Sequence, residues 1–393
     1  MMRRLGILFR RMDWSVVLAV TLLLGIGVAF IFSAGQSQSA AYQTLYLKQM
    51  LWAGLGIACF LGFAFTDYHH WYHRAWWLYF LGLALLLLVF VPGVGVRISG
   101  ARRWIQFAGV RLLQPAEFAK LGLILALARL FGAPARNPRH RRLVLLGLGL
   151  TLAPFFLIAS QPDLGTALVL LPVLGSVMLA AGVPARTLWG LAGAGALALA
   201  AVLILLLAPP ALGWDEARHE ILLERCGISA YQKNRVMVFL KRDADPLDAG
   251  WNKAQSQIAV GSGRLWGKGF QQGTQNILGF LPRTVAPNDF IFSVIAEEKG
   301  FAGSLAVLSL MAVIVYGGLR AALAAPDRIG RLLCAGITAL IFCHVFVNIA
   351  MTIGLLPITG LPLPLLSYGG TFMVGAMSAL GIVQSVYIRG ERN

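Results

Sequence analysis

The chain has 393 residues, of which 58% are hydrophobic and only 12% are charged. Soluble domains carry about 25% charged residues, so this composition excludes an ordinary soluble protein and is typical of an integral membrane protein. The net charge of +17 would indicate nucleic-acid binding in a soluble protein. In a membrane protein, arginines gather in the loops that remain in the cytoplasm, so we expect no nucleic-acid partner.

Apolar segments recur along the whole chain, and a helix needs roughly 20 such residues to cross a bilayer. They predict an all-α, polytopic membrane protein with about ten transmembrane helices, with both termini on the same side. The predicted spans are 13–33, 47–66, 76–92, 114–131, 143–160, 164–182, 187–208, 289–319, 332–354 and 364–388. We expect a single membrane domain over 1–393, with one large extracytoplasmic loop, 209–288, between spans seven and eight.

The distribution of basic residues predicts the orientation of these spans. Arg3, Arg4, Arg10 and Arg11 precede the first span, whereas the connections near 34–46 and 355–363 contain no Lys or Arg. Positive residues favour the cytoplasmic side. We therefore expect a multi-pass protein of the inner (cytoplasmic) membrane, surrounded by membrane lipid, with both termini in the cytoplasm.

The short connection near 93–113 departs from this rule. It carries Arg97, Arg102, Arg103 and Arg111 on the predicted outer side, although short loops with positive charge resist translocation. An anionic ligand at the outer face would explain why these arginines are there. Anionic lipid headgroups are the alternative explanation.

Two groups of polar residues open the middle spans. Gln114, Glu117 and Lys120 lie three residues apart, so they share one face of the fourth span, and Glu117 and Lys120 could simply pair. Ionisable side chains inside a span usually face a cavity or a partner, which indicates a functional site. Asp163 precedes the sixth span and could either cap that helix or contact a ligand.

The eighth span begins with a repeated polar pattern. Asp289, Ser293 and Glu297 recur every four residues, which predicts one polar helix face. Asp289 could be an N-cap, a catalytic carboxylate, or both. Further on, three prolines and four glycines between Gly354 and Gly370 exclude a regular helix. Irregular backbone at membrane depth needs protein cover or a watery cavity, so we expect this segment to line the same site.

Several motifs together resemble the SEDS family (shape, elongation, division and sporulation), on its RodA-like rod-shape branch. The resemblance covers nearly the whole chain. It rests on Arg103-Trp104-Ile105, Gln114-Pro115-Ala116-Glu117-Phe118-Ala119-Lys120, Gln161-Pro162-Asp163-Leu164-Gly165-Thr166, Gly267-Lys268-Gly269, Gly273-Thr274-Gln275, Asp289-Phe290-Ile291-Phe292, Glu297-Glu298 and the 362–370 run with Ser367.

The resemblance implies a peptidoglycan glycosyltransferase, a lipid II polymerase of cell elongation that releases undecaprenyl diphosphate outside the membrane and works with a class B penicillin-binding protein. It implies Asp289 as the essential catalytic residue. We expect the substrate-binding residues to be Arg102, Arg103, Trp104, Gln114, Glu117, Lys120, Asp163, Lys268, Gln275, Glu297 and Ser367.

These residues predict a mechanism in which Asp289 is the general base, while Arg102, Arg103 or Lys268 stabilises the departing diphosphate. No residue pattern demands a metal, although a divalent cation, Mg²⁺ or Mn²⁺, could accompany the diphosphate. The alternatives are a lipid II flippase or transporter, and a non-catalytic scaffold for the penicillin-binding protein. A carrier needs polar residues near the bilayer midplane, whereas these begin at the predicted outer boundary.

Overall fold

The computed structural model describes residues 2–36, 40–98, 101–107, 110–133, 138, 140–211, 213, 215–226, 228, 230–240, 249–281 and 285–390. A helix occupies each of the ten predicted spans. In chain order these helices are α2 (Trp14–Gln36), α4 (Leu45–Phe65), α6 (Ala75–Leu88), α7 (Pro115–Gly132), α8 (Arg141–Ala159), α9 (Leu164–Ala180), α10 (Ala185–Ala211), α15 (Ile291–Leu323), α16 (Arg328–Thr352) and α17 (Gly370–Arg389).

Seven of these helices are long and apolar enough to cross a membrane by length and composition. Two more, α6 and α9, are apolar but shorter. The remaining one, α7, has 18 residues and carries Glu117, Lys120 and Arg129. The chain is therefore a polytopic helical membrane protein, as the apolar segments predicted.

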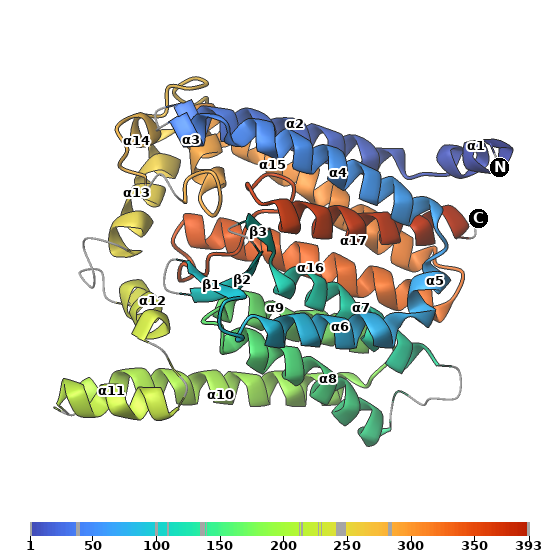
Figure 1. The fold of residues 1–393 in the computed structure, drawn as a ribbon, viewed down its shortest axis with the longest axis horizontal. Coiled ribbons are helices and arrows are strands. Elements are labelled where there is room, and N and C mark those ends of the chain that lie inside the picture. Colours follow the sequence, from blue (N-terminus) through green and yellow to red (C-terminus); the bar gives the residue numbers. More distant parts are fainter. Residues whose placement is uncertain are drawn as a thin grey trace.

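The bundle has two distinct ends (Figure 1). The termini end carries α1 (Met2–Arg10), the short α5 (Tyr68–His73) and the carboxyl end of α17. The opposite end, here called the sheet end, carries α3 (Ala40–Gln43), a small β-sheet and the helices between α10 and α15.

The predicted short loop of arginines is a three-stranded antiparallel sheet. Its strands are β1 (Gly95–Ile98), β2 (Ala101–Phe107) and β3 (Val110–Leu113), in the order β1-β2-β3. Trp104 lies opposite Val96, and Arg102 lies opposite Arg97. The sequence predicted no strands here, because a short arginine-rich run has little apolar alternation. Pairing the backbone groups satisfies them at the edge of the bundle.

The predicted long loop contains four helices, α11 (Glu216–Arg225), α12 (Ala230–Leu240), α13 (Ala249–Ser262) and α14 (Thr274–Ile277). The Ser256 hydroxyl joins α13 to the bundle, because it hydrogen bonds to the Ser293 hydroxyl and to the Thr352 carbonyl. Five basic residues in the connections between helices lie outside the described residues. They are Lys241, Arg242 and Arg283 of this loop, and Arg136 and Arg139 of the connection between α7 and α8.

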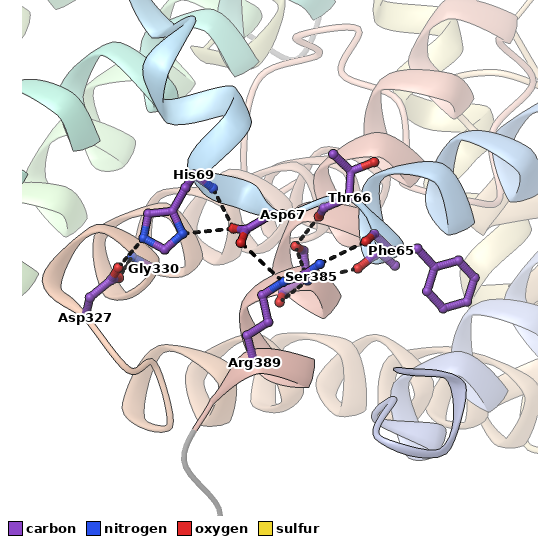
Figure 2. A network of polar contacts seen from close by, with 9 residues as sticks. Phe65, Thr66, Asp67, His69, Asp327, Gly330, Ser385 and Arg389 are labelled. Atoms are coloured by element: carbon purple, nitrogen blue, oxygen red, sulfur yellow. Dashed lines mark hydrogen bonds and ion pairs between the residues drawn. The ribbon is translucent and has the colours of Figure 1, made fainter. Parts of the chain in front are cut away.

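At the termini end, side chains from α5, from the turns before α5 and α16, and from the end of α17 form one polar network (Figure 2). His69 contacts the carboxylates of Asp67 at 2.8 Å and Asp327 at 2.7 Å. Arg389, the last residue of α17, lies 3.7 Å from Asp67 and donates to the backbone carbonyl of Phe65. These contacts fasten α17 to the turns that precede α5 and α16.

Candidate functional site

Asp289 lies at the sheet end, in a turn directly before α15. The helix begins at Ile291, and its N-cap is Phe290, without a side-chain capping hydrogen bond. Of the alternatives that the sequence left open, the N-cap role of Asp289 is therefore wrong, and the helix of the eighth span begins two residues after 289. The carboxylate of Asp289 is consequently available for contacts beyond its own helix.

A long irregular connection, 353–369, lies against this turn and is here called the proline segment. The predicted tenth span began at 364, but α17 starts only at Gly370, because three prolines and several glycines prevent an earlier helix. The Ser367 hydroxyl donates to the Asn288 carbonyl at 2.6 Å, and the Tyr368 amide donates to the Pro287 carbonyl at 2.9 Å. Ser367 therefore joins two backbone segments beside Asp289.

Asp163 and Arg103 come to the same place from α9 and β2. One carboxylate oxygen of Asp163 accepts a hydrogen bond from the Thr166 amide and caps α9. The other oxygen lies 3.5 Å from the Arg103 guanidinium and has no hydrogen-bond partner. Asp163 therefore caps α9, which is one of the two alternatives left open by the sequence, and its second oxygen faces Arg103.

Arg235 of α12 completes a cluster around Asp289. A Cβ atom on Gly360 would lie 3.3 Å from the Asp289 carboxylate and 3.3 Å from the Arg235 guanidinium. Gly360 has a φ of 74°, a conformation that suits glycine. The absence of a side chain here lets the proline segment pass beside both charged groups. We call Asp163, Asp289, Arg103 and Arg235 the charge cluster.

The charge cluster sets the protonation of Asp289. Burial raises the pKa of its carboxyl above the ordinary value, and the negative charge of Asp163 acts in the same direction. The positive charges of Arg235 and Arg103 oppose this increase. A carboxylate with a raised pKa is a stronger proton acceptor, which is the property required of a general base.

The Glu117–Lys120 pair predicted on α7 is confirmed, with a distance of 2.9 Å between its charged atoms. The Lys120 ammonium also contacts His344 of α16 at 2.9 Å, and both partners of the pair are buried. The adjacent cavity has a volume of about 20 Å³, which accommodates a water molecule and no sugar. Glu117 and Lys120 therefore pair with each other and Lys120 with His344, and their contact with substrate stays a prediction.

Lys268, Gln275 and Glu297 form a separate group. The Lys268 ammonium contacts the Glu297 carboxylate at 2.6 Å, and the main-chain N–H of Gln275 donates to the same oxygen at 3.0 Å. Glu297 is buried, and its neighbour Glu298 accepts from the Ser33 hydroxyl. These contacts attach the glycine-rich segment 263–275 to α15. Asp289, Ser293 and Glu297 therefore do not line one cavity: Ser293 packs on α13, and Glu297 packs on the glycine-rich segment.

The remaining predicted residues lie near the sheet without entering the cluster by a hydrogen bond. Arg102 and Trp104 are half-buried on β2. Gln114 precedes α7, and its main-chain N–H donates to the Thr371 hydroxyl. In the part of the chain that the structure describes, no group of three or more His, Cys, Asp or Glu side chains could hold a metal ion.

Two residues near Asp289 were not predicted as part of the site. Arg235 lies in the predicted long loop, 54 positions before Asp289, and belongs to none of the motifs on which the site was predicted. Asn348 of α16 donates to the Asp289 carbonyl at 2.9 Å and to the Leu361 carbonyl at 2.7 Å. An amide inside an apolar span is unusual, and this signal could have identified Asn348.

Comparisons with known proteins agree with this arrangement. The model of the FtsW/RodA/SpoVE family, described as cell cycle protein, matches residues 13–391. The peptidoglycan glycosyltransferase RodA of Treponema pallidum is 33% identical over 96% of this chain and 98% of its own length. The peptidoglycan glycosyltransferase MrdB of Escherichia coli K12 is 37% identical over 80% of this chain and 78% of its own length.

Solved structures are similar as well. A chain from a peptidoglycan synthase complex that coordinates polymerisation and crosslinking aligns with a TM-score of 0.74 and 32% identity, covering 97% of this chain and 99% of that one. The rod shape determining protein RodA of Thermus thermophilus aligns with a TM-score of 0.66 and 29% identity, over 97% and 98% of the two chains. The chain therefore belongs to the FtsW/RodA/SpoVE family, on its RodA-like branch, and is a peptidoglycan glycosyltransferase.

Proposed function

We propose that this glycosyltransferase polymerises lipid II at the sheet end of the bundle, with Asp289 as the general base. The observation that carries the proposal is the charge cluster. A carboxyl group with a raised pKa lies beside two guanidinium groups, next to Gly360 of the proline segment. A base and an anion-binding pair in one place are what transfer from a sugar diphosphate requires.

The proposed reaction proceeds by one displacement. A hydroxyl oxygen of the acceptor sugar attacks the anomeric carbon of the donor and forms the new glycosidic bond. The bond between that carbon and the diphosphate oxygen breaks, and its electron pair leaves with undecaprenyl diphosphate. The hydroxyl proton passes to the Asp289 carboxylate. The base contributes about 10²- to 10⁴-fold to such a step.

The arginines suit the departing diphosphate better than Lys268 does. Guanidinium groups bind phosphate oxygens with two parallel hydrogen bonds, and Arg103 and Arg235 lie beside Asp289. The Lys268 ammonium instead donates to the Glu297 carboxylate and to the Thr274 hydroxyl. We therefore assign the diphosphate to Arg103 and Arg235, with Arg102 of the same strand nearby.

The proposed orientation places the sheet end outside the cytoplasm and both termini inside. It is supported by the arginines before α2 and by the absence of basic residues in 355–363. We also propose a class B penicillin-binding protein as the partner. The similarity to a chain of a peptidoglycan synthase complex supports this assignment.

Polymerisation of lipid II by purified protein in detergent tests the function. We expect Asp289→Asn to lower the rate by about 10³-fold, because the amide cannot accept the proton. Asp215→Asn serves as the control, since Asp215 is an exposed carboxylate before α11 on the same loop. It should polymerise like the unmodified protein.

The same assay separates the alternative functions. A flippase or transporter would make no polymer from lipid II that is already accessible in detergent. A scaffold would leave the polymer yield of its partner unchanged when it is omitted. Normal polymerisation by folded Asp289→Asn would remove this residue from the mechanism.

A further inference from the structure

Two polar side chains interrupt the apolar surface of α16 where it faces the proline segment. His344 and Asn348 are four residues apart, so they lie on one face of the helix, and both are buried. His344 contacts the Pro362 carbonyl through Nδ1 at 3.2 Å, and Asn348 donates to the Leu361 carbonyl at 2.7 Å. One helix thus holds two consecutive carbonyls of the proline segment.

The hydrogen positions follow from the acceptors. A carbonyl oxygen can only accept, so His344 Nδ1 carries the hydrogen and its Nε2 accepts from Lys120. Glu117, Lys120 and His344 therefore form a chain of contacts that ends at Pro362. These contacts link the buried Glu117–Lys120 ion pair to the backbone of the proline segment.

Asn348 makes a second contact that His344 does not. Its amide nitrogen also donates to the main-chain carbonyl of Asp289 at 2.9 Å. Since both acceptors are carbonyls, the amide orientation is determined: the nitrogen faces them, and the oxygen faces away without a partner. One NH₂ group therefore joins the backbone of Asp289 to the proline segment.

This contact determines which atoms meet at the charge cluster. Leu361 directly follows Gly360, beside which the Asp289 carboxylate and the Arg235 guanidinium lie. The contacts of Ser367 and Tyr368 also join the proline segment to 287–288, but both come from the segment itself. The Asn348 contact differs from these because it comes from the regular helix α16, which holds both backbone segments against a rigid element.

We propose that Asn348 is a positioning residue for the glycosyl transfer, holding the Asp289 backbone and the proline segment in the register that places the carboxylate at Gly360. The inference rests on the proposed role of Asp289 as the base. Asn348 itself touches no reacting atom. Its loss would let the carboxylate move, and a misplacement of about 1 Å can lower a rate by about 10²-fold.

The variant Asn348→Leu tests this inference, because leucine has a similar shape and no donor. Among purified, monodisperse molecules, we expect kcat for lipid II polymerisation to fall by about 100-fold while KM changes little. The matched control is Asn276→Leu. Asn276 is also buried, and its amide donates to the Ser33 carbonyl at 3.1 Å, on α2. The control should lower the thermal stability and leave kcat per folded molecule unchanged.

Equal kcat values for Asn348→Leu and Asn276→Leu would overturn the inference and leave Asn348 a structural residue. If Asn348→Leu does not fold, Asn348→Asp provides the same test, since only the protonated carboxyl can donate. The ratio of its kcat to that of the unmodified protein should then fall as the pH rises, and a constant ratio would overturn the inference. The proposed role of Asp289 as the base is tested separately, because activity of Asp289→Asn would contradict that role whatever the result for Asn348.

Discussion

Both ends of the bundle carry charged side chains but use them differently. At the termini end, Asp67 and Asp327 share His69, and Arg389 closes the network with backbone carbonyls (Figure 2). At the sheet end, one oxygen of Asp163 has no hydrogen-bond partner, and its distance to Arg103 is 3.5 Å. Burial also raises the pKa of Asp289 there.

This difference distinguishes polar contacts that stabilise the fold from polar groups that can take part in a reaction. Polar groups that satisfy one another stabilise a fold and have little capacity left for a ligand. Groups that burial brings together without full hydrogen bonding retain that capacity, and perturbed carboxylates in such places indicate functional sites. The comparison therefore supports the proposed location of the reaction at the sheet end, although ionisable residues occur at both ends.

After Asp289→Asn, a large effect within this comparison should come from Arg235. We expect Arg235→Gln to lower kcat/KM for lipid II polymerisation by about 10²-fold, because one charge-assisted contact with the diphosphate is lost. Purified variants in detergent provide the measurement. Arg218→Gln removes an exposed arginine from α11 of the same loop and is the control. A similar loss in both variants would mean that Arg235 acts only through the general positive charge of the loop.

The smallest effect is expected at the termini end. Burial opposes the positive charge on His69, but its hydrogen bonds with Asp67 and Asp327 prevail and raise its pKa. The stabilisation from this contact is present below the ordinary pKa of 6.5 and is lost as the pH rises through the raised value. His69→Gln should therefore lower the thermal midpoint more in acid than in alkaline buffer. The free energy of unfolding lost in acid should be less than about 1 kcal/mol, since the network is partly exposed.

The neighbouring His70 is exposed and provides the matched substitution. His70→Gln should lower the thermal midpoint less than His69→Gln, because the His70 side chain is exposed and is not part of the polar network. Both variants should keep their polymerisation rate per folded molecule. A large loss of rate in His69→Gln alone would show that the termini end takes part in the reaction.

The sequence predicted the spans and part of the site for clear physical reasons. Runs of about 20 apolar residues can only be buried or lie in lipid, so the ten helices follow from hydropathy. The short spacing of Glu117 and Lys120 predicted their pairing. Asp163, Arg103 and Asp289 were expected to act together, and the structure brings them together.

The parts that could not be predicted depend on contacts between distant segments. Helical spacing placed Glu297 on the face of Asp289, but the helix begins after Asp289 and the glycine-rich segment covers Glu297. Arg235 approaches Asp289 only because α12 folds back over the end of α8, where Gln232 donates to the Ala159 carbonyl. No local pattern specifies that approach.

The pH dependence of kcat tests most directly whether the titrating base lies at the sheet end. We predict that kcat falls as the pH drops through the raised pKa of Asp289. Because Arg235 lowers that pKa, Arg235→Gln should move the fall to higher pH, whereas His69→Gln should leave it in place. A fall that stays fixed in Arg235→Gln, or that moves in His69→Gln, would contradict the assignment of Asp289 as the general base.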